Sequence, residues 1–167
     1  MKTGYSLIET LVVVLIIGIL TSVALPQYQK AVRKADLARY MTMVKILRTA
    51  EDVYYETYKT YTDDLDLLDI HLPSNITGCS KKTATYGQFY ECKGEIRYGI
   101  FNNASNAQAG GPSLRYAQVI KDYKDNGVNF KAGENVCFFK GDAMEKVCRT
   151  LGPGTKKKGN GWSFWVM

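Results

Sequence analysis

The stretch that most constrains this chain is the uncharged apolar run from Thr10 to Gln29, which is rich in Leu, Val and Ile. Its 20 residues are about the number that an α-helix needs to cross some 30 Å of hydrocarbon. A carboxylate, Glu9, stands at the head of the run. A charge costs roughly 3 kcal/mol at the centre of a bilayer and less near its surface, and it usually has a function there. The run predicts a membrane helix in which Glu9 has a special role.

A short basic leader, MKTG, precedes this helix. A secretory signal peptide has its cleavage site after the apolar region, whereas Gly4 lies before it, so cleavage at Gly4 would leave the helix on the mature protein. Gly4, an aromatic residue at Tyr5, the segment SLIE that ends at Glu9, the apolar run and Pro26 resemble the N-terminus of type IV pilins and the related pseudopilins. The resemblance covers roughly residues 1–60, and the family most often has Phe at the position of Tyr5.

The resemblance implies a set of processing and assembly residues. A prepilin peptidase would cut between Gly4 and Tyr5, and the same enzyme would methylate the new Tyr5 amine. Glu9 would then be the nearest acidic group for the Tyr5 amine of a neighbouring subunit, since a carboxylate in an apolar bundle requires a partner. The alternative is that Glu9 simply rests among lipid headgroups.

The helical pattern continues past the membrane segment to about Tyr58. Because a stripe of apolar residues spaced three or four apart is typical of an amphipathic helix, residues 30–58 are predicted to pack on a sheet. The stripe consists of Val32, Ala35, Ala38, Met41, Val44, Leu47, Ala50, Tyr54 and Tyr58. The predicted organisation is a leader at 1–4, a transmembrane and assembly helix at 5–29, its amphipathic second half at 30–58 and a globular head at 59–167.

Gly18 and Pro26 are the weak points of the predicted helix. Proline removes a backbone hydrogen bond and crowds the carbonyl of Ser22, and glycine has a low helix propensity. The simplest interpretation is a modest kink, which membrane helices tolerate. In the family these positions match the segment thought to unwind when subunits enter a filament, and the two interpretations are compatible.

Four cysteines lie downstream of the membrane segment, and they allow three disulfide pairings. Local pairing of Cys79 with Cys92 and of Cys137 with Cys148 is favoured because each pair closes a short loop. A structural zinc site would need cysteines two to four residues apart, which these spacings do not provide. Disulfides indicate an oxidising compartment.

The basic residues after the apolar run, Lys30, Arg33, Lys34 and Arg39, would place the head on the cytoplasmic side by the positive-inside rule. The cysteines and the pilin resemblance both place it outside, and these two features decide the prediction. We expect a single-pass inner-membrane precursor that becomes part of a periplasmic or cell-surface filament.

The C-terminal half of the chain reads as short strands, so we predict an α+β, pilin-like domain with a small antiparallel sheet. Strands are expected at 84–92, 95–102, 113–123 and 128–130, with Asn126-Gly127 as a hairpin turn. Further strands are expected at 136–139 and at the C-terminus from Trp162. Asp142 is expected to cap a short helix that contains Cys148 and ends near Gly152.

Residues 59–78 read as a polar, turn-rich linker with a short helical turn. Its four aspartates, Asp63, Asp64, Asp66 and Asp69, lack the spacing and the glycine of an EF-hand, so no metal site is predicted. GPGTKKKG lacks the spacing of a phosphate-binding loop and reads as a mobile solvated loop. The single histidine, His71, has no nucleophile that can be tied to it, so neither an enzyme nor a cofactor is predicted.

Residues 73–167 carry fourteen basic and seven acidic side chains, a surplus that can attract nucleic acid but is also ordinary for a soluble domain. Nucleic acid is therefore a possible partner without further support. The predicted function is a structural subunit of a type IV pilus-like filament, assembled from copies of itself with a prepilin peptidase and an inner-membrane assembly platform. The alternatives are a pseudopilin of a type II secretion system, a DNA-binding minor pilin for uptake, and a single-pass receptor.

Overall fold

The structure is a computed structural model that describes residues 6–70, 78–94, 96–101, 104–125, 127–159 and 161–167. The chain divides into two compact units, Met1–Ala35 and Asp36–Met167. The first helix, α1 (Leu7–Tyr58), contributes its first half to one unit and its second half to the other. Gly4, Tyr5, His71 and Asn126 lie outside the described residues, so the predictions that concern them are not addressed by the structure.

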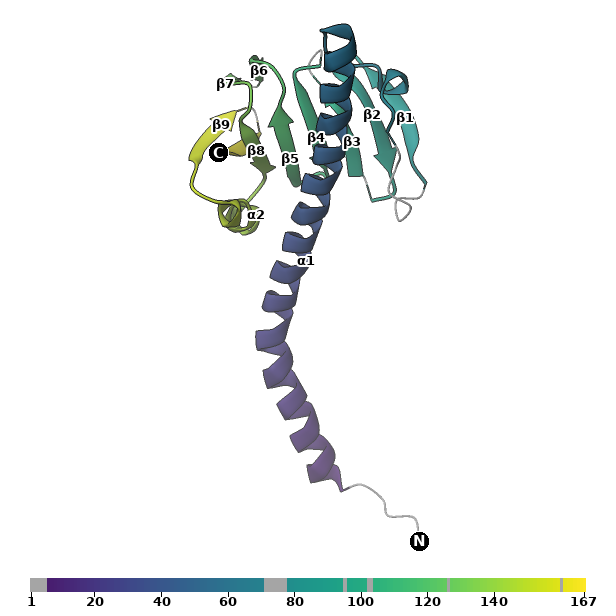
Figure 1. Ribbon diagram of the computed structural model, residues 1–167. Coiled ribbons are helices and arrows are strands. Elements are labelled where there is room, and N and C mark those ends of the chain that lie inside the picture. Colours follow the sequence, from purple (N-terminus) through teal and green to yellow (C-terminus); the bar gives the residue numbers. More distant parts are fainter. Residues whose placement is uncertain (1–5, 71–77, 95, 102–103, 126, 160) are drawn as a thin grey trace. The chain divides into compact units, whose positions relative to one another are not determined.

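The second half of α1 packs on the sheet of the second unit, as the apolar stripe predicts (Figure 1). The buried stripe is rotated from the predicted one: of the predicted residues only Val44 and Leu47 are fully buried, while Val32 stays 41% exposed. The spacing of the buried residues is still three or four, as one helical face requires. These residues are Leu37, Tyr40, Met43, Val44, Leu47 and Glu51.

The sheet has eight antiparallel strands in the order β1-β2-β3-β4-β5-β8-β10-β9, and β6 pairs with β7 in a separate two-stranded ribbon. This arrangement confirms the predicted α+β class. The strands of the main sheet are β1 (Ser80–Ala84), β2 (Gly87–Cys92), β3 (Ile96–Phe101), β4 (Asn106–Gly110), β5 (Leu114–Val119), β8 (Asn135–Phe139), β9 (Thr155–Gly159) and β10 (Trp162–Val166). The ribbon consists of β6 (Tyr123–Asp125) and β7 (Val128–Phe130).

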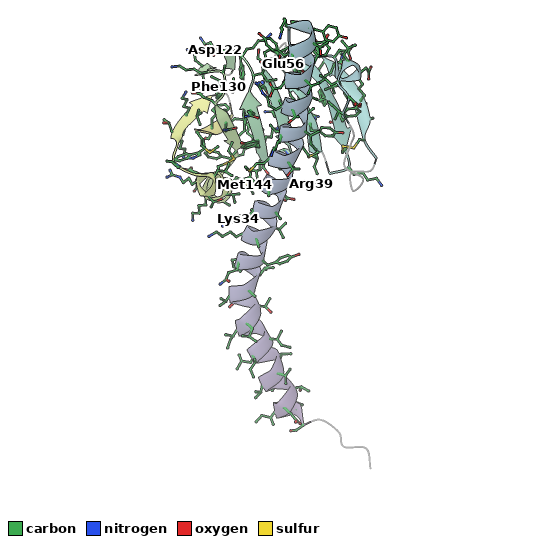
Figure 2. The ribbon with its side chains drawn as sticks, in the orientation of Figure 1. Lys34, Arg39, Glu56, Asp122, Phe130 and Met144 are labelled. Carbon is green, nitrogen blue, oxygen red and sulfur yellow. A yellow bond between two sulfur atoms is a disulfide. The ribbon has the colours of Figure 1, made fainter. Side chains whose placement is uncertain are left out.

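Alternating side chains of the strands feed two separate cores. On one face, Ile100, Tyr116 and Phe139 join the buried stripe of α1. On the other face, Phe138 and Phe164 form a smaller core with Phe130 of β7; Phe130 is labelled in Figure 2. The ring of Phe130 meets that of Phe164 edge-on at 5.5 Å between centroids, a favourable aromatic geometry. Both faces of the sheet are thus covered at the end that carries β8 and β10.

Two strand predictions and one loop prediction are corrected. The strand expected at 84–92 is a hairpin, with β1 and β2 joined at Thr85-Tyr86, and the strand expected at 113–123 ends at Val119 before β6 begins. β4 was not predicted. GPGTKKKG, expected to be a mobile loop, contains β9, which pairs with β10 along its full length. The final strand is confirmed as β10.

The short helix near the C-terminus is α2 (Asp142–Cys148), followed by a 3-10 turn at Arg149–Leu151. Gly141, with φ of 81°, occupies the N-cap position, and Asp142 is the first helical residue. The prediction that Asp142 caps this helix is therefore wrong. The carboxylate still lies in the first turn, where it interacts favourably with the helix dipole.

The predicted linker after α1 contains the expected helical turn, η1 (Leu65–Leu67). It is not simply solvated, because Leu65 and Leu68 are buried in the core beneath it. The backbone N–H of Leu65 donates to the side-chain oxygen of Gln88 on β2 at 3.2 Å. Lys81 of β1 forms ion pairs with Asp64 and Asp66. The aspartates therefore fix the turn to the sheet edge through a lysine.

Candidate functional site

The candidate assembly site is the N-terminal end of α1, where the described chain begins at Ser6. The backbone N–H of Ser6 donates to Oε2 of Glu9 at 3.4 Å. Ser6 precedes the first helical residue, so Glu9 has the position of the acidic residue in a capping box. Among the described residues this is the one hydrogen bond that the carboxylate accepts. The Glu9 side chain is exposed and lies at the helix end whose dipole favours a negative charge.

The first half of α1 presents apolar side chains on every side, and none of its most apolar window is buried (Figure 2). Leu7 is 77% exposed and Leu20 is 64% exposed. In the described part of the chain, α1 is the one helix that is long and apolar enough to cross a membrane. Such a surface is stable only in hydrocarbon or against other apolar helices.

Gly18 and Pro26 do not interrupt the helix, which is continuous through both residues. Pro26 has no N–H to offer to the carbonyl of Ser22, and the Ser22 hydroxyl donates to the carbonyl of Ile19 at 2.7 Å. Apart from its chain neighbours and the nearby backbone of its own helix, a Cβ atom at Gly18 would meet no atom within 4 Å. No neighbouring group in the subunit thus requires glycine at this position. The proposed weakness of both residues stays a prediction.

Glu51 is the site residue that sequence reasoning missed. It lies on α1 and is fully buried, with 0% of its surface exposed. Its Oε2 accepts the backbone N–H of Thr62 at 3.2 Å, which ties the segment after α1 back onto the helix. Its Oε1 is buried with no hydrogen-bond partner among the described residues. The spacing of Glu51 from Leu47 and Val44 was the available signal, because it places the carboxylate on the buried face.

Burial holds the Glu51 carboxyl partly in the neutral form. Burial raises the pKa of Glu51 to about 7, although the Thr62 N–H and the charge of Arg48 act in the opposite direction. Arg48 is drawn away by Asp52, with 2.8 Å between the charged atoms, and its guanidinium lies 5.6 Å from the ring centre of Tyr61. A carboxyl group that titrates near neutrality therefore joins the helix to the following loop.

The structure joins Cys79 to Cys92 and Cys137 to Cys148, with sequence separations of 13 and 11. The first bridge ties the segment before β1 to the end of β2, and the second ties β8 to α2. These are the two local pairs that loop length favours. Each bridge closes a loop for which the chain-entropy estimate gives roughly 3 kcal/mol of stabilisation.

We expect non-reducing peptide mapping of the exported protein to recover Cys79–Cys92 and Cys137–Cys148 as the two linked peptide pairs. Reduction should lower the free energy of unfolding of the head by several kcal/mol in total, because both loops open. The same digest of reduced, alkylated protein is the control. A crossed pairing, or four free thiols, would contradict this prediction and the oxidising compartment that rests on it.

The three consecutive lysines that drew attention in the sequence do not form one basic patch. They lie on β9, where alternation directs neighbours to opposite faces of the sheet. Lys156 pairs with Glu145 of α2. Lys157 donates to the backbone carbonyl of Asn129 at 3.2 Å, and Lys158 is exposed. These lysines alone therefore give no support to a nucleic-acid site.

Comparison with known proteins finds type IV pilins. The chain is 42% identical over 50 residues to the type IV major fimbrial protein FimA of Dichelobacter nodosus, and 43% identical over 51 residues to a fimbrial protein of Pseudomonas aeruginosa. It is 30% identical over 78 residues to the type IV major pilin protein PilE of Neisseria gonorrhoeae. These matches cover 30%, 30% and 47% of this chain and 32%, 33% and 47% of the relatives.

The chain thus spans about a third of the length of the first relatives it matches. No family model matches it, and no solved structure matches it significantly. The relatives are nevertheless named as type IV pilins or fimbrial proteins. That is the family that Gly4, Tyr5, Glu9 and the apolar run resemble in the sequence. They confirm the resemblance recognised in the sequence: this chain is similar to the type IV pilins.

Proposed function

We propose that this protein is a structural subunit of a type IV pilus-like filament. The observation that carries the proposal is the first half of α1, which exposes apolar side chains on every side behind a single carboxylate, Glu9. The head has cores of its own on both faces of its sheet. A helix that is apolar on every side suits two environments in turn, lipid before assembly and the helices of other subunits afterwards.

In this proposal the precursor is a single-pass protein of the inner membrane, with its head in an oxidising compartment where both disulfides persist. A prepilin peptidase removes residues 1–4 and methylates the Tyr5 amine. An assembly platform then adds the subunit to a periplasmic or surface filament. The role is structural, and no catalytic residue is assigned.

Within the filament, Glu9 pairs with the Tyr5 amine of a neighbouring subunit. The support is energetic, because a carboxylate surrounded by apolar helices needs a counter-charge. In the separate subunit, the N–H of Ser6 supplies only one neutral hydrogen bond to this carboxylate. Gly18 and Pro26 supply the local weakness that lets the helix adjust during packing.

We expect intact-mass analysis of membrane-extracted protein to show the loss of residues 1–4 and the gain of one methyl group. Replacing Gly4 by leucine should leave the leader attached, because a bulky side chain would stand at the bond to be cut. Gly18→Ala is the matched control, since a Cβ there meets no atom within 4 Å outside its own helix, and it should be processed normally. A mature protein that still begins at Met1 would overturn the proposal.

Electron microscopy of cells with and without this gene separates the proposed pilus subunit from a secretion pseudopilin. We expect long surface filaments that disappear when the gene is deleted and return when it is supplied again. Loss of a secreted enzyme from the medium, with surface filaments unchanged, would favour the pseudopilin.

A further inference from the structure

Three basic residues follow the apolar run of α1, and the proposed filament function does not use them. They are Lys30, Arg33 and Lys34, and we call them the juxtamembrane cluster. Lys30 and Lys34 are exposed and Arg33 is partly exposed. Lys34 is labelled in Figure 2, where its side chain extends away from the helix. Because residues three and four positions apart are neighbours on a helix surface, the cluster concentrates three positive charges on one side of α1.

No acidic side chain in the described part of the chain neutralises the cluster. None of its three cations forms an ion pair or a side-chain hydrogen bond with another described residue. Asp36 lies three residues after Arg33 on the same helix and still makes no ion pair with it. Glu9, the acidic residue of the first unit, stands at the opposite end of the apolar run. The positive charge of the cluster is therefore available to a partner outside the subunit.

The position of the cluster along α1 matches the headgroup layer of a membrane. The 20 residues 10–29 rise about 30 Å as a helix, which is the thickness of the hydrocarbon core. Lys30 then lies about 1.5 Å and Lys34 about 7.5 Å beyond Gln29 along the helix axis. The headgroup layer on each side is about 5–8 Å thick, so the whole cluster falls within it. Arg39, about 15 Å beyond Gln29, falls outside.

An aromatic residue marks the same boundary on the other side of the helix. Tyr28 is 69% exposed, and the two residues from Tyr28 to Lys30 turn the helix by about 200°. Tyrosine is enriched at membrane surfaces because its ring is apolar and its hydroxyl is polar. Tyr28 and the juxtamembrane cluster are therefore suited to hold α1 at one depth from opposite sides.

The usual distribution of charge around membrane helices does not account for the cluster. With the head in an oxidising compartment, as proposed above, the cluster belongs to the leaflet that faces away from the cytoplasm. Lysine and arginine normally gather on the cytoplasmic side. The inference that follows rests on this part of the proposed function, the insertion of α1 with the head outside, and not on filament assembly. A negatively charged partner at the membrane surface would account for the cations.

We propose that the juxtamembrane cluster binds the headgroups of anionic phospholipids in the leaflet next to the head, with lipid phosphates on Lys30, Arg33 and Lys34. The guanidinium of Arg33 can hold a phosphate through two parallel hydrogen bonds, and the lysines act as point charges. The long stems of all three side chains can lie along the apolar helix while their charges reach the headgroups. A zwitterionic headgroup carries a cation of its own, so lipids with a net negative charge are preferred. The bound lipids set the depth at which the stored subunit sits.

The test is native mass spectrometry of the full chain in detergent, titrated with phosphatidylglycerol or with phosphatidylcholine of the same acyl chains. Each cation beside an anionic headgroup is expected to tighten binding roughly fivefold. The native chain should therefore prefer phosphatidylglycerol by roughly ten- to a hundredfold. The triple variant Lys30→Gln, Arg33→Gln and Lys34→Gln should bind both lipids equally. Higher salt should weaken the preference of the native chain, because exposed charges are screened.

The matched control removes the same number of charges from three exposed lysines of the head, Lys121, Lys131 and Lys146. Changed together to glutamine, they should leave the preference for phosphatidylglycerol intact. Equal binding of the two lipids by the native chain would overturn the proposal, and so would equal losses in the two triple variants. Displacement of the lipid by millimolar inorganic phosphate at constant ionic strength would make the cluster a site for free phosphate, which also contradicts the proposal.

Carbonate extraction of cell membranes separates this proposal from the insertion of α1 on which it rests. The native chain and the cluster variant should both stay in the membrane fraction, because the apolar run is unchanged. A native chain that carbonate releases would overturn the proposed function together with this inference. An inserted chain with no lipid preference would overturn this inference alone. If that chain also lost its filaments on replacement of the cluster, the three cations would serve contacts between subunits instead.

Discussion

Cells that carry Glu9→Val in place of the native subunit are expected to insert the protein, cleave it at Gly4 and build no filaments. The substitution removes an acidic group from an apolar segment, so membrane retention should not suffer. In the filament core it leaves the Tyr5 amine of a neighbour without a counter-charge. Stranding one partner of a buried ion pair costs roughly 3–5 kcal/mol, and the cost recurs at every added subunit. The measurements are the processed fraction by mass spectrometry and filament counts by electron microscopy.

Glu9→Gln separates the proposed ion pair from the local hydrogen bond with Ser6. Glutamine can still accept the Ser6 N–H but carries no charge, so filaments should again be absent if the pairing with Tyr5 is what matters. Glu9→Asp keeps the charge and shortens the side chain by one methylene, and we expect it to assemble partially. Normal filament numbers in the valine variant would reject the pairing and leave Glu9 as an interfacial residue. If the glutamine variant forms filaments and the valine variant does not, the role of Glu9 would be to accept the Ser6 N–H and cap the helix.

The long helix and the α+β class could be predicted because the features that determine them are local. An apolar run of membrane length has few alternatives, and the three-to-four spacing that follows Pro26 requires a helix with one buried face. The exact face was harder to predict. Alanines such as Ala35 and Ala38 matched the stripe by type, whereas Leu37 and Tyr40, one or two positions away, are the residues that fill the core.

The missed strands have a different cause. β4 (Asn106–Gly110) contains Asn, Ala, Gln and Gly and no β-branched or aromatic residue, so propensity gives no signal for it. Its place between β3 and β5 supplies the hydrogen bonds and covers Ala107 and Ala109 completely. β9 was missed for a similar reason, because three lysines read as solvent-exposed loop. Pairing with β10 overrides the preference of lysine for exposed loops, and the three lysine side chains lie in different surroundings.

The candidate functional residues divide in the same way. Glu9 was proposed from the sequence because a carboxylate at the head of an apolar run is a local anomaly. Glu51 was overlooked because acidic residues on an amphipathic helix are normally assigned to the solvent face.

The buried carboxyl of Glu51 gives a second large expected effect, a pH-dependent stability of the head. Its pKa is about 7 in the folded protein, against 4.5 for an ordinary glutamate. A raised pKa means that the folded state holds the proton more tightly than the unfolded state. The contribution of the protonated Glu51 carboxyl to the stability of the folded head is therefore complete below pH 4.5. It declines between pH 4.5 and 7 and is lost above that range. The difference corresponds to about 3 kcal/mol in the free energy of unfolding.

Glu51→Gln is expected to remove this dependence, because glutamine resembles the neutral carboxyl and can still accept the Thr62 N–H. At pH 8 the variant should be more stable than the native chain by about 3 kcal/mol, or roughly 6–12 °C in Tm for a chain of this size. At pH 4.5 the two should differ little. The measurement is thermal unfolding of the full chain in detergent, followed by near-UV circular dichroism across this pH range.

The matched control is Glu56→Gln, which changes an acidic residue further along α1 (Figure 2). Glu56 is exposed, and its one ion-pair partner among the described residues is Lys59, itself exposed, so its replacement should shift Tm by little and equally at all pH values. Because the other charges that act on Glu51, those of Arg48, Asp52 and Asp63, are the same in both variants, the comparison isolates the titration of one group. Native and Glu51→Gln curves that run parallel from pH 4.5 to 8 would mean that Glu51 stays charged in the folded head. The contact with Thr62 would then be an ordinary charged hydrogen bond.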